Sequence, residues 1–229
     1  MKKNQNKIPK SALNAEKLHR QVVGRLLAQP LAPNRRLAAP LQWGLWILII
    51  LVAVGMMALS MGTRSLKQGY STHPSGLIFL LLALALTVMT SWEAFASSIP
   101  GRRTSSGYKL TACLTLGALA LFPFFPPHFG GLWQQSEEVM AGSLKCAVSI
   151  FTLGLMVWAG MAWMLSRNAA VRPGWTGACS GLAAFMVGAI IIQWGCPNWH
   201  SGHLWVSHLL PVAVAAGLTA YLGKRWFFQ

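Results

Sequence analysis

Residues 174–194 read GWTGACSGLAAFMVGAIIIQW, a run of 21 residues without a single charged side chain. A helix needs roughly 20 mostly apolar residues to cross the hydrocarbon core of a bilayer, because the core is about 30 Å thick and each residue adds about 1.5 Å. This run therefore predicts a membrane-spanning helix. Gly177, Gly181, Ala184 and Gly188 lie along one stripe of it, where small side chains let a neighbouring helix approach closely.

Five further segments of the chain meet the same criterion of length and apolar character. They cover approximately Leu41–Gly62, Ser75–Ile99, Gly107–Pro126, Ser143–Leu165 and Leu204–Gly223. Proline lies in the breaks between several of these segments, where it ends helical hydrogen bonding and allows the chain to reverse direction. The sequence thus predicts an all-α membrane protein, a six-transmembrane-helix bundle with short loops.

The composition fits a membrane protein and argues against several classes of enzyme. Hydrophobic residues make up 54% of the 229 residues, and charged residues only 10%. The chain contains no aspartate, and its four acidic residues are Glu16, Glu93, Glu137 and Glu138. Hydrolysis and phosphoryl transfer commonly depend on acidic residues that are largely missing here. We expect neither enzymatic activity nor a bound cofactor.

Positive charge is distributed unequally across the predicted membrane. If the N-terminus lies inside, 16 of the 19 lysines and arginines fall on the side of both termini, and only Arg64, Lys67 and Lys145 fall on the other side. Loops rich in lysine and arginine stay in the cytoplasm. The pattern predicts a multi-pass membrane protein with both termini cytoplasmic. Because the membrane surface accounts for the net charge of +15, direct nucleic-acid binding is not expected.

The predicted organisation has three parts. Residues 1–40 form a cytoplasmic N-terminal segment, residues 41–223 form the six-helix transmembrane domain, and residues 224–229 form a short cytoplasmic tail. The N-terminal segment is the only sizeable part predicted to lie outside the membrane. A segment that meets a cytoplasmic partner is therefore expected there.

Residues 11–29 of the N-terminal segment predict a basic amphipathic helix that ends before Pro30. Its apolar stripe comprises Leu18, Val22 and Leu26. Its basic face comprises Lys17, Arg20 and Arg25. Such a helix can lie on anionic lipid or dock in a groove of a cytoplasmic protein. Physical grounds alone favour the two alternatives about equally.

The four cysteines separate into two pairs on the predicted topology. Cys146 begins the fourth span and Cys196 ends the fifth, so both lie at the outer face, whereas Cys113 and Cys179 lie in the inner half. In an oxidising periplasm the outer two can form a lasting disulfide if their α carbons come within roughly 4.4–6.8 Å. A redox-sensing or metal-sensing pair and ordinary packing both remain open for them. Cys113 and Cys179 are expected to be small core residues.

Histidines follow the second outer cysteine closely. Residues 196–203 read CPNWHSGH, which places His200 and His203 in the same short loop as Cys196. Thiolate and imidazole ligands suit zinc or copper, so the two histidines are candidate metal ligands, although their spacing matches no standard zinc finger. We expect His208, about one turn into the last span, to be an interfacial or packed residue.

Several stretches of the chain resemble the NrsF-type membrane anti-sigma family. These stretches are LAQPLAP at 27–33, IPGRR at 99–103, SLKCAVSI at 143–150, SRNAAVRP at 166–173 and the Cys-Pro pair at 196–197. Members of that family look like six-helix inner-membrane regulators that hold an extracytoplasmic-function sigma factor inactive through a short cytoplasmic N-terminal segment. Two outer cysteines respond to stress in them.

The resemblance implies a role for two parts of this chain. It assigns the stress-responsive pair to Cys146 and Cys196 and the sigma-contacting segment to roughly residues 11–29. The expected function is an inner-membrane anti-sigma factor that releases its sigma factor when stress is sensed at the outer face. Its expected partners are that sigma factor, on the cytoplasmic side, and membrane lipids.

Two other functions remain as alternatives. The outer cysteines permit a membrane thiol oxidoreductase of the quinone-linked type, but the chain lacks the C-x-x-C pair that is typical of such enzymes. A small transporter or a structural membrane subunit is the other alternative. A proton-coupled or ion-coupled transporter would be expected to carry more ionisable groups within its spans.

Overall fold

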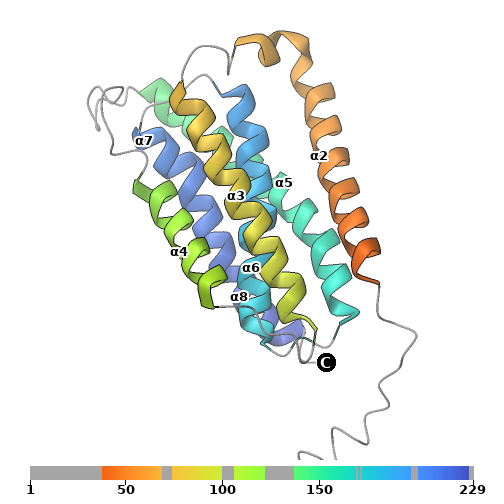
Figure 1. The fold of residues 1–229 in the computed structure, drawn as a ribbon. Coiled ribbons are helices and arrows are strands. Elements are labelled where there is room, and N and C mark those ends of the chain that lie inside the picture. Colours follow the sequence, from red (N-terminus) through yellow and green to blue (C-terminus); the bar gives the residue numbers. More distant parts are fainter. Residues whose placement is uncertain are drawn as a thin grey trace, which may run out of the picture. The chain divides into compact units, whose positions relative to one another are not determined.

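The fold, seen in a computed structural model, is helical throughout the part that it describes (Figure 1), namely residues 38–68, 74–99, 106–121, 137–168, 170, 172–196 and 201–226. The helices are α2 (Ala39–Gln68), α3 (Pro74–Ser97), α4 (Ser106–Leu121), α5 (Glu137–Ser166), α6 (Pro173–Gly195), and a last continuous helix made of α7 (Ser201–His203), η3 (Leu204–Leu209) and α8 (Leu210–Trp226). No strand occurs in these ranges, so the predicted all-α class is confirmed for them.

Five of the described helices are long and apolar enough to cross a membrane. They coincide with five of the six predicted spans. The third predicted span, Gly107–Pro126, is represented by α4, whose 16 residues give a length of about 24 Å. This is shorter than the hydrocarbon core of about 30 Å. The described residues therefore support a bundle of apolar helices without establishing the full number of six spans.

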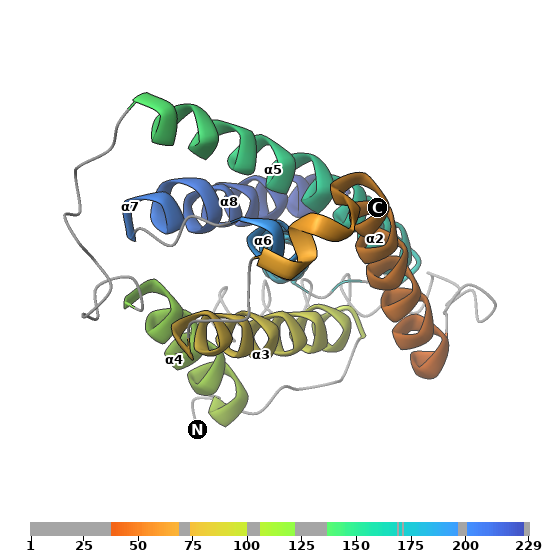
Figure 2. The same cartoon turned by 90° about the horizontal axis from the view of Figure 1, so that it is seen from above.

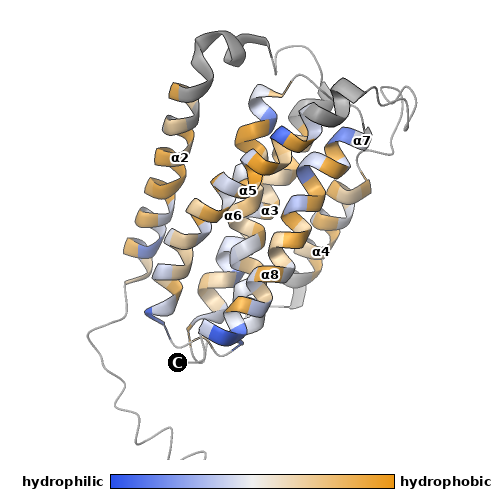
Figure 3. Ribbon diagram, turned by 180° about the vertical axis from the view of Figure 1, so that it is seen from behind, coloured by the Kyte–Doolittle hydropathy of each residue, from blue (hydrophilic) through white to orange (hydrophobic). Residues whose placement is uncertain are grey.

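Large apolar side chains cover the outside of the bundle. Leu51 on α2 is 60% exposed and Leu114 on α4 is 64% exposed, and similar residues lie on the outer faces of the other helices. Figure 3 shows that hydrophobic positions, in orange, recur along the lengths of the helices. Contiguous apolar surface of this extent is unfavourable in water but suits contact with lipid. The surface supports the membrane class that the composition predicted.

Helix α6 forms the centre of the bundle. In its membrane-length stretch 78% of the residues are buried, compared with 17% in that of α2. The principal neighbours of α6 are α8, α5 and α3. The view from above places α6 between α5 and α3 (Figure 2). Because α6 is apolar on every face and surrounded by other helices, it is the helix that fixes the positions of its neighbours.

The small residues predicted to form a packing stripe on α6 lie against two neighbours. A Cβ atom added at Gly177 or Gly181 would collide with Thr219 on α8. One added at Gly188 would lie 3.0 Å from the carbonyl oxygen of Ile150 on α5. The glycines therefore bring the backbones of α5, α6 and α8 close together. This close approach also sets the separation of the side chains at the helix ends.

Candidate functional site

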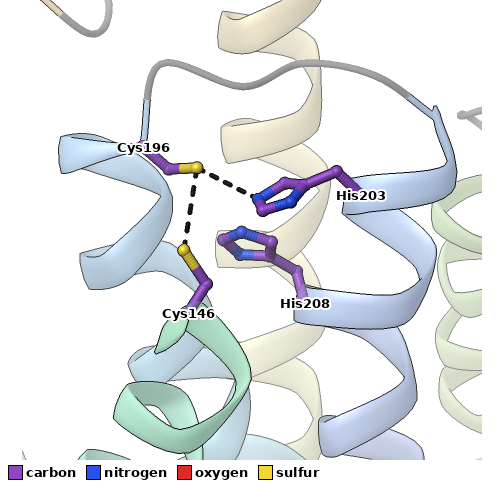
Figure 4. A group of neighbouring side chains, drawn as sticks. All are labelled: Cys146, Cys196, His203 and His208. Atoms are coloured by element: carbon purple, nitrogen blue, oxygen red, sulfur yellow. Dashed lines mark hydrogen bonds between the residues drawn. The ribbon is translucent and has the colours of Figure 1, made fainter. Parts of the chain in front are cut away.

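Four side chains from three parts of the bundle converge at one of its ends (Figure 4). Cys146 projects from α5, Cys196 follows the last residue of α6, His203 ends α7, and His208 lies in η3. The order of the helices puts this cluster at the start of α5, the end of α6 and the start of the last helix. Most basic residues of these helices lie at the opposite ends, namely Arg167, Arg172, Lys224 and Arg225, whereas Lys145 lies next to Cys146.

The donor atoms of the Cys/His cluster are close to one another. The two sulfur atoms are 3.9 Å apart, and the Cys196 sulfur lies 3.2 Å from Nε2 of His203. One sulfur or nitrogen atom from each of the four residues lies within 4.8 Å of all the others. Cys146 is partly buried, whereas Cys196, His203 and His208 are 5%, 2% and 0% exposed. The cluster is thus a buried group of four soft or borderline ligand atoms.

Two hydroxyl groups hold the His203 ring. Its Nδ1 lies 2.9 Å from the Ser143 hydroxyl oxygen on α5 and 3.3 Å from the Ser207 hydroxyl oxygen in η3. When Nδ1 carries the ring proton, it donates to these oxygens, and Nε2 keeps its lone pair directed toward Cys196. The serines therefore favour one orientation of the ring.

The π-helical turn η3 brings His208 next to His203. In a regular α-helix, residues five apart lie about 140° from each other around the axis, because each residue turns about 100°. In η3 the Leu210 N–H donates to the Trp205 carbonyl, an i to i+5 bond that puts residues five apart one turn above each other. The two imidazole centroids are accordingly 5.3 Å apart.

Pro211 gives a local reason for the wide turn. Proline has no N–H to donate to the carbonyl four residues earlier, here that of Ser207, and its ring clashes with that carbonyl in a regular α-helix. The π-helical turn ends at Leu209, directly before this region. Turns of this kind are rare and occur frequently at functional sites.

The His208 ring is fully buried without a hydrogen bond of normal length to either nitrogen from the described residues. The Cys146 thiol and the Ala189 backbone interact with the ring electrostatically but do not meet the geometry of a hydrogen bond. Burying an unpaired polar group costs about 1–3 kcal/mol. An imidazole without a hydrogen bond in this position therefore lowers the stability of the fold, and a residue that served only to pack would not need a polar ring here.

Not all of the residues that the sequence predicted for this region belong to the cluster in the structure. The structure brings Cys146, Cys196 and His203 together, whereas His200 lies outside the described residues. His208, which we expected to be an interfacial or packed residue, is fully buried and also belongs to the cluster. The spacing of five residues between His203 and His208, followed by Pro211, is the signal that could have identified it.

Cys113 and Cys179 lie elsewhere in the fold. Cys179 is buried, as predicted, but the prediction was wrong for Cys113, which is exposed because α4 packs mainly against α3 and leaves much of its surface uncovered. Both cysteines line a cavity of about 180 Å³ whose wall also includes Glu93 and Trp175. The Trp175 indole N–H donates to Glu93 at 2.8 Å. The rest of the cavity wall is apolar apart from one threonine.

The residues of the predicted partner-binding helix lie outside the described residues. They are Leu18, Val22, Leu26, Lys17, Arg20 and Arg25. Their role in binding stays a prediction.

The Cys/His cluster permits two kinds of chemistry. Two thiols at 3.9 Å can approach to the bonding distance of about 2.05 Å after a small shift of the helix ends, which would give a disulfide. Two thiolates and two imidazoles can also hold a metal ion. Either change would alter how the ends of α5, α6 and the last helix are held together.

Comparison with protein-family models finds a match over most of the chain. The family model of NrsF, described as negative regulator of sigma F, matches residues 27–227. No curated protein and no solved structure matches the chain. The matched range covers all four residues of the cluster and every described helix up to Trp226.

Proposed function

This chain belongs to the NrsF family of negative regulators of sigma F, and from that premise we propose that it is an anti-sigma factor embedded in the bacterial inner membrane. It holds an extracytoplasmic-function sigma factor inactive on the cytoplasmic side. It releases the factor when a stress at the outer face changes the state of Cys146 and Cys196. The protein has no catalytic activity of its own in this proposal.

One structural observation supports this proposal most strongly. The two thiols lie 3.9 Å apart at the end of the bundle opposite Arg167, Arg172, Lys224 and Arg225. Since basic residues favour the cytoplasm, the thiol pair falls on the oxidising side, where its state can change. The helices that carry the thiols then connect this outer end to the inner face.

Six spans with both termini inside form part of the proposal. The sequence that follows Leu121, the last described residue of α4, stays apolar and includes Phe122, Phe124 and Phe125. An even number of spans places both termini on one side. The count of lysines and arginines then assigns that side to the cytoplasm.

Reporter fusions test this topology. Alkaline phosphatase joined after Glu138 or Ser201 is expected to be active, because it folds only in an oxidising compartment. The same enzyme joined after Arg103 or at the C-terminus is expected to be inactive. A cytoplasmic reporter at the same four positions serves as the control and should give the opposite pattern. Phosphatase activity at the C-terminus would contradict six spans.

The output of the proposed regulator is the segment 11–29. The other cytoplasmic connections of the proposed topology are short, for example the few residues between α5 and α6. An apolar stripe on a helix can fill a groove of the sigma factor and supply most of the affinity. The basic face would meet an acidic rim and mainly raise the association rate.

Membrane recruitment of the sigma factor tests the function directly. The full-length chain, expressed with the sigma factor encoded in the same genome, is expected to shift most of that factor from the soluble fraction to the membrane fraction and to co-purify with it in detergent. An unrelated multi-pass protein with the same tag is the control. If the sigma factor stays soluble at matched expression levels, the chain does not act by sequestration.

A further inference from the structure

The Cys/His cluster contains more ligands than a thiol switch needs. A disulfide uses only the two sulfurs, yet two buried imidazoles lie with them, with donor atoms from all four residues within 4.8 Å of one another. Two thiolates and two imidazoles are the set that tetrahedral zinc sites use. We propose that Cys146, Cys196, His203 and His208 form a four-coordinate site for a divalent thiophilic metal ion of the zinc class.

His203 is already oriented as a metal ligand. Metal-bound histidines commonly donate the N–H of the second ring nitrogen to a neighbouring oxygen, which fixes the ring and the tautomer. Here Ser143 and Ser207 lie at Nδ1, at 2.9 Å and 3.3 Å, and Nε2 points to the Cys196 sulfur at 3.2 Å. The hydroxyls thus leave the correct nitrogen available for a metal ion.

His208 supplies an independent reason. It is 0% exposed, no hydrogen bond of normal length from the described residues reaches its ring nitrogens, and Figure 4 shows its ring beside the sulfurs and the His203 ring. The π-helical turn is what brings it there. A bound metal ion gives this buried imidazole the partner that the surrounding residues do not provide.

Charge favours a divalent ion. Binding displaces one proton from each thiol, and the imidazoles bind as neutral rings. The two thiolates then balance the two positive charges of the ion, so the occupied site has no net charge. A neutral group is far less costly than an unbalanced one in a buried position.

The ion would join three helix ends. Its ligands come from α5, from the end of α6, and from α7 and η3, so binding fixes the outer ends of these helices relative to one another. A signalling role for the bound ion at the outer face depends on the function proposed above. The existence of the metal site does not depend on that function.

Metal binding can be measured on the purified full-length protein alone. The reduced, metal-free protein in detergent is titrated with Co²⁺, a spectroscopic substitute for Zn²⁺. One equivalent should bind and give the intense visible absorption of tetrahedral cobalt together with thiolate-to-cobalt charge transfer. Addition of Zn²⁺ should remove both signals. If neither Co²⁺ nor Zn²⁺ binds at one equivalent, or if only Cu⁺ binds, the proposal is overturned.

Single substitutions test the identity of the ligands. Cys146→Ser, Cys196→Ser, His203→Gln and His208→Gln should each abolish the tetrahedral cobalt spectrum. Ser143→Ala should weaken binding about 10–100-fold by removing the support of His203. His200→Gln and Cys113→Ser are the matched controls and should keep the spectrum. An unchanged spectrum in His208→Gln, with loss in His200→Gln, would overturn the proposed ligand set.

Two further measurements keep the test decisive. Helical circular dichroism and a single elution peak must show that each variant is folded, and in the wild type Zn²⁺ should protect two thiols from alkylation. Co-purification of the sigma factor is then compared with and without Zn²⁺. Binding without any effect on the sigma factor supports the site and contradicts its proposed signalling role. If the protein binds no metal but still retains the sigma factor, the proposed metal site is wrong and the proposed anti-sigma function stands.

Discussion

Deletion of residues 11–29 is expected to switch on the target genes of the sigma factor in unstressed cells, while the protein still inserts into the membrane. The deletion removes the proposed docking helix but none of the described bundle, which begins after it. Transcription of the target genes should then be constitutive, near the level reached when the whole protein is absent. Target mRNA and the membrane content of the protein are measured in the same cells.

Point substitutions separate docking from a general effect of the deletion. Asp at both Val22 and Leu26 should weaken sigma binding by about 2 kcal/mol or more for each anchor, or roughly 30-fold each, because a charge would be buried in the interface. Asp at Gly24 and Ala28 adds the same two charges away from the apolar stripe and should retain repression. If the membrane-inserted deletion variant still represses the targets and still co-purifies the sigma factor, the segment is only a lipid-surface anchor.

Replacing either outer cysteine by serine is expected to abolish the stress response. In Cys146→Ser and in Cys196→Ser, induction of the target genes should fall from its wild-type value to near one-fold, because a single remaining sulfur can neither form the disulfide nor complete the metal site. Cys113→Ser is the matched control, since Cys113 lies away from the cluster. Reporter transcription before and after stress gives the induction ratio.

A labelling experiment checks the same pair chemically. A membrane-impermeant thiol reagent should modify Cys146 and Cys196 in the reduced protein from the outer side, and mild oxidation should prevent it. Wild-type induction in both serine variants would show that these thiols are not the sensor. Equal labelling after oxidation would show that they do not form a disulfide.

Most of the helical architecture was predictable from the sequence. Helices α2, α3, α5, α6 and the last helix lie within a few residues of their predicted spans, because the hydrophobic length of a segment is a local property that the chain itself displays. For α4 the structure describes the helix as far as Leu121, and the predicted end of this span at Pro126 lies outside the described residues.

The candidate site was predictable only in part. The sequence predicted that Cys146 and Cys196 lie at the same membrane face, because Cys146 begins the fourth predicted span and Cys196 ends the fifth. The chain therefore crosses the membrane twice between them. It could not show that their sulfurs lie 3.9 Å apart, since this depends on how α5 and α6 are rotated and how closely Gly188 lets them approach. The exposed position of Cys113 depends in the same way on how little of α4 is covered.

The amino-acid sequence was thus enough to predict the helical class, the approximate limits of the apolar helices and the small residues that let them pack closely. The grouping of His208 with the two thiols and His203, in contrast, follows from the way the helices pack. That outcome depends on the π-helical turn before Pro211, which rotates one residue onto the face of another five positions earlier, and on the meeting of three helix ends. Hydropathy and residue spacing are local properties of the sequence. The geometry of a four-residue site depends instead on how the helices are rotated and how far apart they lie, and helix packing sets both.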